Sequence, residues 1–195
     1  MYKPVGLLTL QGDYEKHQQA FAALGVETLG VRRPAELGDI CALVVPGGES
    51  TTLTRLMDRI GLRQPLLDFA VDHPVMGTCA GLIMMSSGLV DEKNSDFGVE
   101  PLGMLDCLVR RNGYGRQIDS FTAPVGIDVL EGSSHTFDAV FIRAPRIVEV
   151  GPLANVVAVH DGEPVAVRQG NLLGLTFHPE LTADGRIHQA FLEMI

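Results

Sequence analysis

One cysteine of this chain is placed as a nucleophile would be. Cys79 lies between glycines in the run Gly-Thr-Cys-Ala-Gly of residues 77–81, with apolar residues on both sides. A strand that turns abruptly into a helix has this pattern, because glycines relieve the crowding of the turn and leave the middle side chain exposed on the bend. A thiol at a helix N-terminus is also favoured as the thiolate, the form that attacks. We therefore expect Cys79 to be the nucleophile of an acyl-transfer site.

A second segment, His-Pro-Glu at residues 178–180, has the partners that such a nucleophile needs. His178 could act as the general base, and Glu180 could orient its ring and balance its charge. Each fragment alone has a simpler interpretation, since a lone cysteine in a glycine-rich turn is more often a buried small residue and a lone His-Pro-Glu is more often a surface turn. Because each follows a predicted strand, their joint presence favours a Cys79-His178-Glu180 triad.

Acyl transfer also needs donors aimed at the oxyanion of the tetrahedral intermediate. The backbone N–H of Ala80, directly after the nucleophile, points to that place in a turn of this kind. The pair Gly47-Gly48 follows another apolar run and could present a second N–H, because glycine permits the backbone conformation and the close approach. By itself this pair would be an ordinary loop, but beside the predicted turn we interpret Gly48 and Ala80 as the oxyanion hole.

The elements that must position these residues follow from hydrophobic periodicity and from turn signals. Short apolar runs predict buried strands, and longer runs that end at glycine predict helices. Ser50 or Thr51 is expected to cap the helix after the glycine pair. The predicted strands cover residues 5–10, 26–31, 40–45, 75–78, 105–110, 123–130, 139–142, 156–160, 165–168 and 172–177. The predicted helices cover residues 13–24, 50–60, 64–71, 80–87 and 184–195.

The order of these elements predicts an α/β fold. Strands alternate with helices in the N-terminal half, which is typical of a doubly wound, mainly parallel sheet flanked by helices. From about Leu102 the segments become β-rich, and Asp161-Gly162 predicts an antiparallel hairpin. Ligands of such sheets bind at the carboxyl ends of the strands. The loops at 46–48, 79 and 178–180 all follow strands, so we expect them to converge at one edge of the sheet.

Length, charge and cysteine content limit the class of protein. The 195 residues predict one domain spanning residues 1–195, long enough for a full core. The formal net charge of −9 argues against a nucleic-acid partner. Three widely spaced cysteines without a Cys-x-x-Cys pair argue against a disulfide framework and a zinc site. No apolar run approaches the roughly 18 residues of a membrane span. We expect a soluble, cytoplasmic protein that binds neither nucleic acid nor membrane.

Motifs spread over nearly the whole chain make it resemble the class I, triad-type glutamine amidotransferases. Gly-x-Cys-x-Gly at 77–81 and His-Pro-Glu at 178–180 belong to the whole superfamily. Other motifs point to the branch of glutaminase subunits of pyridoxal 5'-phosphate synthases. They are Leu-Gln-Gly at 10–12, Gly-Gly-Glu-Ser-Thr at 47–51, Arg-Asn-Gly-Tyr-Gly-Arg-Gln at 111–117 and Phe-Ile-Arg-Ala-Pro at 141–145.

The resemblance implies a three-layer, flavodoxin-like α/β fold with a small antiparallel extension, and hydrolysis of L-glutamine to L-glutamate and ammonia. Cys79 would attack the side-chain amide, His178 would protonate the departing ammonia, and water would release the glutamyl thioester. No cofactor and no metal are implied. The ammonia would pass to a partner synthase that makes pyridoxal 5'-phosphate from a pentose phosphate and a triose phosphate. The implied glutamine pocket comprises Gly47, Gly48, Glu49, Arg111, Ile142 and Arg143.

The partner is expected to dock at the sheet edge that carries Cys79. Gln11 lies at the end of the first predicted strand, and Asp13 begins the first predicted helix. We expect both residues to meet the synthase and to couple docking to activation. The same helix would cover the sheet in any fold of this type, with or without a partner.

Alternatives remain for the pocket and for the function. Arg111 and Arg143 could form surface ion pairs, and Glu49 could be a solvated acid at a helix N-terminus. The chain could be a glutaminase for another acceptor, such as imidazole glycerol phosphate synthase, a cysteine peptidase or esterase, or a binding module without activity. Activation by a synthase other than pyridoxal 5'-phosphate synthase would indicate another acceptor. Turnover of peptides or esters would indicate a peptidase or esterase, and glutamine binding without ammonia release would indicate a binding module.

Overall fold

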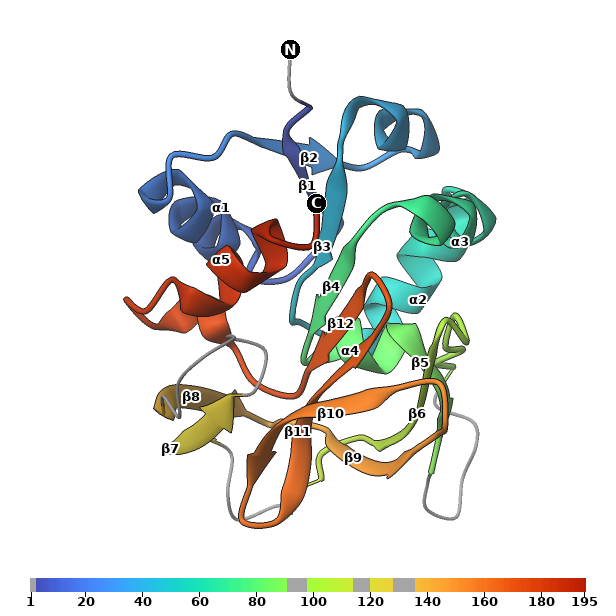
Figure 1. Ribbon diagram of the computed structural model, residues 1–195. Coiled ribbons are helices and arrows are strands. Elements are labelled where there is room, and N and C mark those ends of the chain that lie inside the picture. Colours follow the sequence, from blue (N-terminus) through green and yellow to red (C-terminus); the bar gives the residue numbers. More distant parts are fainter. Residues whose placement is uncertain (1–2, 91–97, 114–119, 128–135) are drawn as a thin grey trace.

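The computed structural model describes residues 3–90, 98–113, 120–127 and 136–195. Residues 114–117 of the arginine-rich motif and the end of the strand predicted for 123–130 lie outside the described residues. In the described part, helices cover both faces of a large sheet, and a β-rich portion adjoins its C-terminal strands (Figure 1). The α/β architecture that the element order predicts is therefore confirmed.

The large sheet has a parallel half and an antiparallel half. From β2 to β12 neighbouring strands run parallel, and from β12 to β8 they run antiparallel. In their order across the sheet the strands are β2 (Thr28–Val31), β1 (Val5–Leu8), β3 (Ala42–Val45), β4 (Val75–Thr78), β12 (Leu172–Leu175), β11 (Glu163–Gln169), β10 (Asn155–His160), β7 (Ser120–Ile127) and β8 (Thr136–Ile142). The order matches the predicted doubly wound sheet, in which motif loops meet at one edge.

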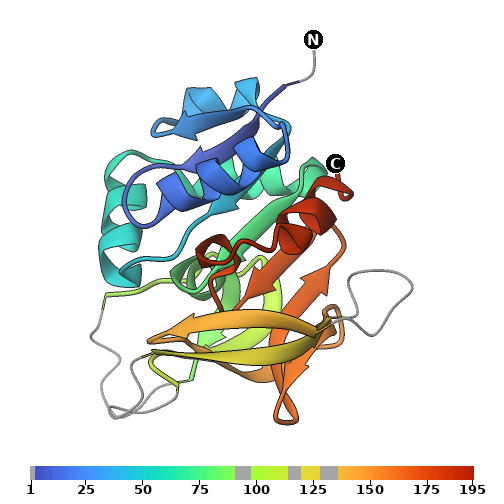
Figure 2. The same ribbon diagram turned by 90° about the vertical axis from the view of Figure 1, so that its left-hand side faces the viewer.

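The apolar strands β1 and β3 divide their side chains between two cores. Leu43 and Val45 pack on one face of the sheet, and Ala42 and Val44 pack on the other, because successive side chains of a strand point to opposite faces. Helices α2, α3 and α4 cover the first face, and α1 and α5 the second (Figures 1 and 2). The helices are α1 (Tyr14–Ala23), α2 (Ser50–Arg59), α3 (Arg63–Asp72), α4 (Ala80–Met85) and α5 (Arg186–Leu192), with 3-10 helices η1 (Pro34–Asp39) and η3 (Pro179–Leu181).

A smaller sheet ends helix α4 earlier than the sequence indicates. It consists of β5 (Ser86–Leu89), β6 (Leu105–Arg110) and β9 (Arg146–Val150). The predicted helix 80–87 is wrong at its C-terminal end, because Leu102 N–H donates to Met84 O at 2.6 Å and Met104 N–H to Met85 O at 3.1 Å. The residues that follow pair with β6 instead of extending the helix.

The N-cap predicted for the helix after the glycine pair is also wrong by one residue. Glu49, rather than Ser50 or Thr51, caps α2, and its carboxylate accepts the backbone N–H groups of Thr51 at 3.0 Å and Thr52 at 2.6 Å. A carboxylate stabilises this position because it satisfies two free N–H groups and lies at the positive end of the helix dipole.

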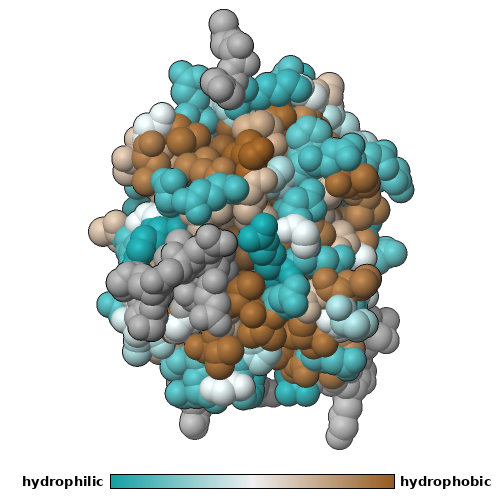
Figure 3. Space-filling model, in the orientation of Figure 1, coloured by the Kyte–Doolittle hydropathy of each residue, from teal (hydrophilic) through white to brown (hydrophobic). Residues whose placement is uncertain are grey.

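The surface is mixed in character. On the face shown in Figure 3, hydrophobic residues form several separate groups with hydrophilic residues between them. Among the described residues, no helix is long and apolar enough to cross a membrane.

Candidate active site

The turn between β4 and α4 holds Cys79 in a conformation that few residues adopt. Its φ is 50° and its ψ is −103°. Such strain is typical of residues whose side chain must project at a functional site. The turn has no room for side chains on its flanks, since a Cβ on Gly81 would lie 2.0 Å from Val45 O and one on Gly77 would lie 2.7 Å from Gly81 C. Glycine is therefore required on both sides by close packing.

His178 and Glu180 form a buried pair beside this turn. His178 lies three residues after the end of β12, and its backbone N–H donates to Val140 O at 2.8 Å. Its Nδ1 lies 2.7 Å from Glu180 Oε1, and the two residues are only 3% and 5% exposed. A Cβ on Gly47 would lie 2.4 Å from His178 Cε1, so any larger residue at this position would clash with the imidazole ring. The structure thus brings together Cys79, His178 and Glu180.

The surroundings of His178 favour its protonated form. Burial alone would lower the pKa of His178, but hydrogen bonds and charge interactions with Cys79 and Glu180 outweigh burial and raise the pKa to about 10. Because Nδ1 is bonded to Glu180, Nε2 is the nitrogen that remains for Cys79. This arrangement can move a proton between a thiol and an imidazole while the carboxylate balances the charge.

Two further histidines lie behind the carboxylate, and sequence reasoning missed both. His17 Nε2 lies 3.4 Å from Glu180 Oε2, and His17 Nδ1 lies 3.0 Å from His188 Nε2. Both histidines are fully buried. The available signal was the spacing of His17 and Phe21, which is one helical turn and places both on the inward face of α1.

A pocket of about 200 Å³ opens in front of Cys79. It is smaller than the roughly 300–1,000 Å³ that holds drug-sized ligands, which fits a substrate of amino-acid size. The predicted residues that line it are Gly48, Glu49, Cys79, Arg111, Ile142, Arg143 and His178. Asp13, predicted for the partner interface, also lines it, as do Ser50, Ile83 and Asn112, which were missed. Gly47, Ala80 and Glu180 do not line the pocket but adjoin residues that do.

Glu49 has two roles at the charged rim of the pocket. Arg111 Nη2 lies 3.6 Å from Glu49 Oε1, with the Arg111 side chain 19% exposed and that of Glu49 51% exposed. Partial burial raises the pKa of Glu49, but hydrogen bonds from Thr52 and Thr51 outweigh it and lower the pKa to about 2. Glu49 therefore stays ionised while it caps α2 and faces the pocket. Arg143 also lines the pocket and has a left-handed φ of 42°.

The loop after β1 rests on the glycine pair. Asp13 N–H donates to Gly47 O at 3.4 Å, and the side-chain carbonyl of Gln11 accepts from Glu49 N–H at 3.1 Å. Gln11 Nε2 is buried without a hydrogen-bond partner among the described residues. Ala80 is the first residue of α4, where helical N–H groups have no partner within the helix. The loop of the predicted docking residues therefore contacts the loop that carries Gly48, one of the two predicted oxyanion donors.

One group of side chains has the spacing of metal ligands. Donor atoms of Asp13, His178 and Glu180 lie within 4.8 Å of one another. His178 Nδ1 and Glu180 Oε1 are already bonded to each other, and the remaining His178 nitrogen faces Cys79. We therefore interpret the His178–Glu180 pair of this group as proton-transfer machinery.

Comparison with known proteins finds relatives along nearly the whole chain. The model of the SNO glutamine amidotransferase family matches residues 7–195. A protein named "Pyridoxal 5'-phosphate synthase subunit PdxT" from Streptomyces coelicolor is 46% identical over 192 residues, which cover 98% of this chain and 93% of that protein. The protein of the same name from Thermotoga neapolitana is 44% identical over 192 residues and 98% of both chains.

Solved structures show the same architecture. A crystal structure described as a glutamine amidotransferase has a TM-score of 0.89 and 40% identity, covering 97% of both chains. PurLQS from Thermotoga maritima has a TM-score of 0.73 at 16% identity over 99% of both chains, a likeness of fold alone.

Proposed function

The chain belongs to the SNO glutamine amidotransferase family, and from that premise we propose that it hydrolyses L-glutamine to L-glutamate and ammonia for a pyridoxal 5'-phosphate synthase. The observation that carries this proposal is the buried His178–Glu180 pair beside the strained Cys79, at the wall of a small pocket. We assign this activity to one glutaminase domain of residues 1–195.

The first half of the reaction forms a thioester. Cys79 Sγ, as the thiolate, attacks the side-chain carbonyl carbon of glutamine, and the carbonyl oxygen becomes an oxyanion. The N–H groups of Ala80 and Gly48 stabilise that charge. His178 Nε2 gives its proton to the amide nitrogen, the C–N bond breaks, and ammonia leaves. A glutamyl thioester on Cys79 remains.

The second half restores the enzyme. His178, now neutral, takes a proton from water as the water oxygen attacks the thioester carbonyl. A second tetrahedral intermediate collapses, the C–S bond breaks, and the Cys79 thiolate leaves with glutamate as the product. Glu180 stabilises the imidazolium throughout, because its carboxylate is bonded to His178 Nδ1 at 2.7 Å.

The charged groups of the pocket suit the head group of an amino acid. Its carboxylate requires cations, which Arg111 and Arg143 provide, and its ammonium requires an acceptor, which Glu49 provides. Gly47, Gly48 and Ile142 complete the walls with backbone and apolar contacts. A substrate bound in this way directs its carboxamide toward Cys79.

Ammonia release is useful only where an acceptor receives it, so we assign a synthase partner to this chain. The relatives at 44–46% identity are named as subunits of pyridoxal 5'-phosphate synthase, which supports the same partner here. Gln11 and Asp13 are the proposed docking residues, because their loop lies on the glycine pair. We also propose a cytoplasmic location, which suits a chain whose three cysteines are free.

The test is ammonia release from L-glutamine by wild type and Cys79→Ala, with and without a pyridoxal 5'-phosphate synthase subunit. We expect the synthase to stimulate the wild type and Cys79→Ala to lose at least about 10³-fold in kcat, as for other triad nucleophiles. Cys79-dependent activity that ignores this synthase would assign another acceptor. Absence of ammonia release with the synthase present would overturn the function.

A further inference from the structure

We propose that His17 is a positioning residue of the triad, a neutral imidazole whose Nε2–H faces the second carboxylate oxygen of Glu180. This inference rests on the proposed function, since it extends the same proton-transfer machinery by one residue. Glu180 would then be held on both sides, by His178 at Oε1 and by His17 at Oε2.

The contacts of Glu180 show why a second partner is needed. Its side chain is fully buried, and Oε1 is bonded to His178 at 2.7 Å. Oε2 is buried and makes no hydrogen bond of normal geometry among the described residues. The polar atom that faces it is His17 Nε2, at 3.4 Å. A buried carboxylate oxygen without any donor is costly, so whether His17 Nε2 carries a proton decides how well Glu180 stays ionised.

The tautomer of His17 follows from its other partner. His17 Nδ1 and His188 Nε2 are 3.0 Å apart, so one of them donates and the other accepts. If His17 donated from Nδ1, its bare Nε2 would face a carboxylate, and His188 Nδ1, which has no partner, would carry a buried unpaired N–H. If His188 donates, His17 carries its proton on Nε2, toward Glu180 Oε2 and toward Thr78 Oγ1 at 3.4 Å. Only the second arrangement pairs each buried N–H with an acceptor.

Burial keeps both histidines neutral. Desolvation, followed by the charges of His188 and His178, holds the pKa of His17 well below its ordinary value. Desolvation lowers the pKa of His188 to about 4. Titratable groups near the pair among the described residues include Asp13 at the start of α1, whose carboxylate lies within 4.8 Å of the donor atoms of His178 and Glu180, and Cys79, which contacts His178. Lys16 of α1 and Asp184 line a surface pocket together with Glu180. His17 therefore contributes a donor without adding a charge.

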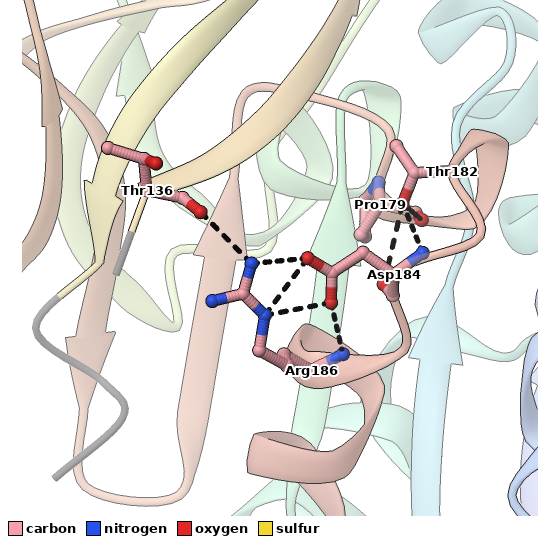
Figure 4. Close-up of polar contacts among 5 residues, drawn as sticks. All are labelled: Thr136, Pro179, Thr182, Asp184 and Arg186. Carbon is pink, nitrogen blue, oxygen red and sulfur yellow. Dashed lines mark hydrogen bonds and ion pairs between the residues drawn. The ribbon is translucent and has the colours of Figure 1, made fainter. Parts of the chain in front are cut away.

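The helix that carries His188 is fixed to the triad loop. Arg186, the first residue of α5, holds Asp184 with Nε at 2.9 Å from both carboxylate oxygens, and its Nη2 donates to Thr136 O at 3.0 Å (Figure 4). Thr182 Oγ1 donates to Pro179 O at 3.1 Å and accepts from Asp184 N–H at 3.2 Å. The segment from His178 to α5 is thus braced, and His188 reaches His17 from a defined position.

The first test reads the tautomer directly and does not depend on activity. Wild-type protein labelled with ¹⁵N-histidine is examined at neutral pH by long-range ¹H–¹⁵N correlation of the imidazole rings, and the His17 signals are assigned by their loss in His17→Gln. We expect the neutral Nε2–H pattern for His17. The Nδ1–H pattern or an imidazolium would overturn the inference even if glutaminase activity is present.

The second test measures kcat, KM and the pH profile of kcat/KM with the synthase present. His17→Leu removes the donor, and we expect kcat to fall about 10- to 100-fold, as for partners that orient ligand histidines, with KM within about twofold. The alkaline limb of the kcat/KM pH profile of His17→Leu should move to lower pH by about one unit, because a less ionised Glu180 stabilises the His178 imidazolium less. His17→Gln, whose amide can donate from the same place, should recover most of kcat and the alkaline limb.

The control is His73→Leu, which removes a partly buried histidine that contacts Phe69 rather than the triad. It should leave kcat and the pH profile unchanged. If His17→Leu keeps the wild-type alkaline limb, or if His17→Gln is as impaired as His17→Leu, the positioning role fails. Loss of ammonia release in the wild type would instead overturn the proposed function and leave the tautomer result standing.

Discussion

A buried carboxylate controls the protonation of a buried imidazole at this site. Glu180 is 5% exposed, and together with Cys79 it raises the pKa of His178 to about 10 against the effect of burial. Removing the charge but keeping the shape separates these contributions. The oxygen of a glutamine side chain can still accept from Nδ1–H, whereas its neutral amide cannot balance an imidazolium.

We therefore expect Glu180→Gln to reduce kcat by roughly 10³- to 10⁴-fold, by analogy with the loss of charge in a serine-protease triad. The alkaline limb of the pH profile of Glu180→Gln should also lie at lower pH than that of the wild type, because Glu180 no longer raises the pKa of His178 by its charge. Steady-state ammonia release across pH, with the synthase present, measures both effects. An unchanged thermal midpoint is the control for folding, and a wild-type kcat would show that Glu180 is not part of the proton path.

The residues of the candidate site could be predicted where local sequence constrains them. Cys79 is marked by its glycines, whose side-chain space is taken by backbone atoms of the same turn and of β3. His17 and His188 have no such mark, because they meet across 171 positions of the sequence and only the packing of α1 against α5 brings them together. Asn112 and Arg143 have left-handed φ values of 47° and 42°, which the sequence does not indicate for an arginine.

At the level of elements, the close contact of α4 with β3 depends on one missing side chain. A Cβ on Gly81 would lie 2.0 Å from Val45 O, and neither the strand nor the helix can yield without losing core contacts. We expect Gly81→Ala to lower the free energy of unfolding by about 2–3 kcal/mol, as for overpacked cores. Urea denaturation followed by circular dichroism measures the change.

Gly38→Ala is the matched control for that substitution. Gly38 lies in η1, has nothing within 4 Å of its Cβ position and does not have a left-handed backbone. Its effect should stay below about 1 kcal/mol, because the main consequence is a less flexible unfolded chain. Equal effects of the two substitutions would contradict the packing argument.

The cap of α2 predicts how stability changes in acid. The pKa of Glu49 is about 2 in the folded protein against an ordinary 4.5, so its contribution is complete above about pH 4.5 and is lost as pH falls toward 2. Glu49→Ala should lower the free energy of unfolding by about 0.5–1 kcal/mol at pH 7, near the low end for caps because half of the side chain is exposed. The difference from wild type, measured by urea denaturation at pH 7, 5 and 4, should shrink below pH 4.5. A difference that is constant over this range would exclude the charged cap.

The helices and strands could be predicted from the sequence where hydrophobic periodicity determines them. The buried runs of β1, β3, β4 and β12 stand out because parallel strands are apolar on both faces. The end of α4 could not be predicted, because its last carbonyls are satisfied by the distant residues Leu102 and Met104. The cap Glu49 was missed for a related reason, since Ser and Thr beside it are the more frequent caps and the choice depends on where the loop leaves β3.

At the scale of the whole molecule, one edge of the sheet carries both the pocket and the proposed docking loop. Four loops converge there, after β1, β3, β4 and β12, as the carboxyl ends of parallel strands dictate. The Gln11 side chain accepts from Glu49 N–H in the loop after β3 and lies beside Gly48, where a Cβ would be 2.5 Å from Gln11 Oε1. A partner bound to the first loop would therefore act on the proposed oxyanion donor Gly48 through the Gln11 side chain.

This geometry gives a prediction for activation by the synthase. Gln11→Ala removes the contact with Glu49 N–H and the buried amide Nε2 that has no partner among the described residues. We expect synthase-stimulated ammonia release to fall about 10-fold, the equivalent of one hydrogen bond of about 1.4 kcal/mol, while thermal stability stays close to wild type. Gln64→Ala removes an exposed glutamine of α3 whose side chain donates to Asp68; it is the control and should keep full stimulation. Full stimulation of Gln11→Ala would show that docking reaches the active site by another loop, whereas a loss shared by both variants would point to a general effect on folding.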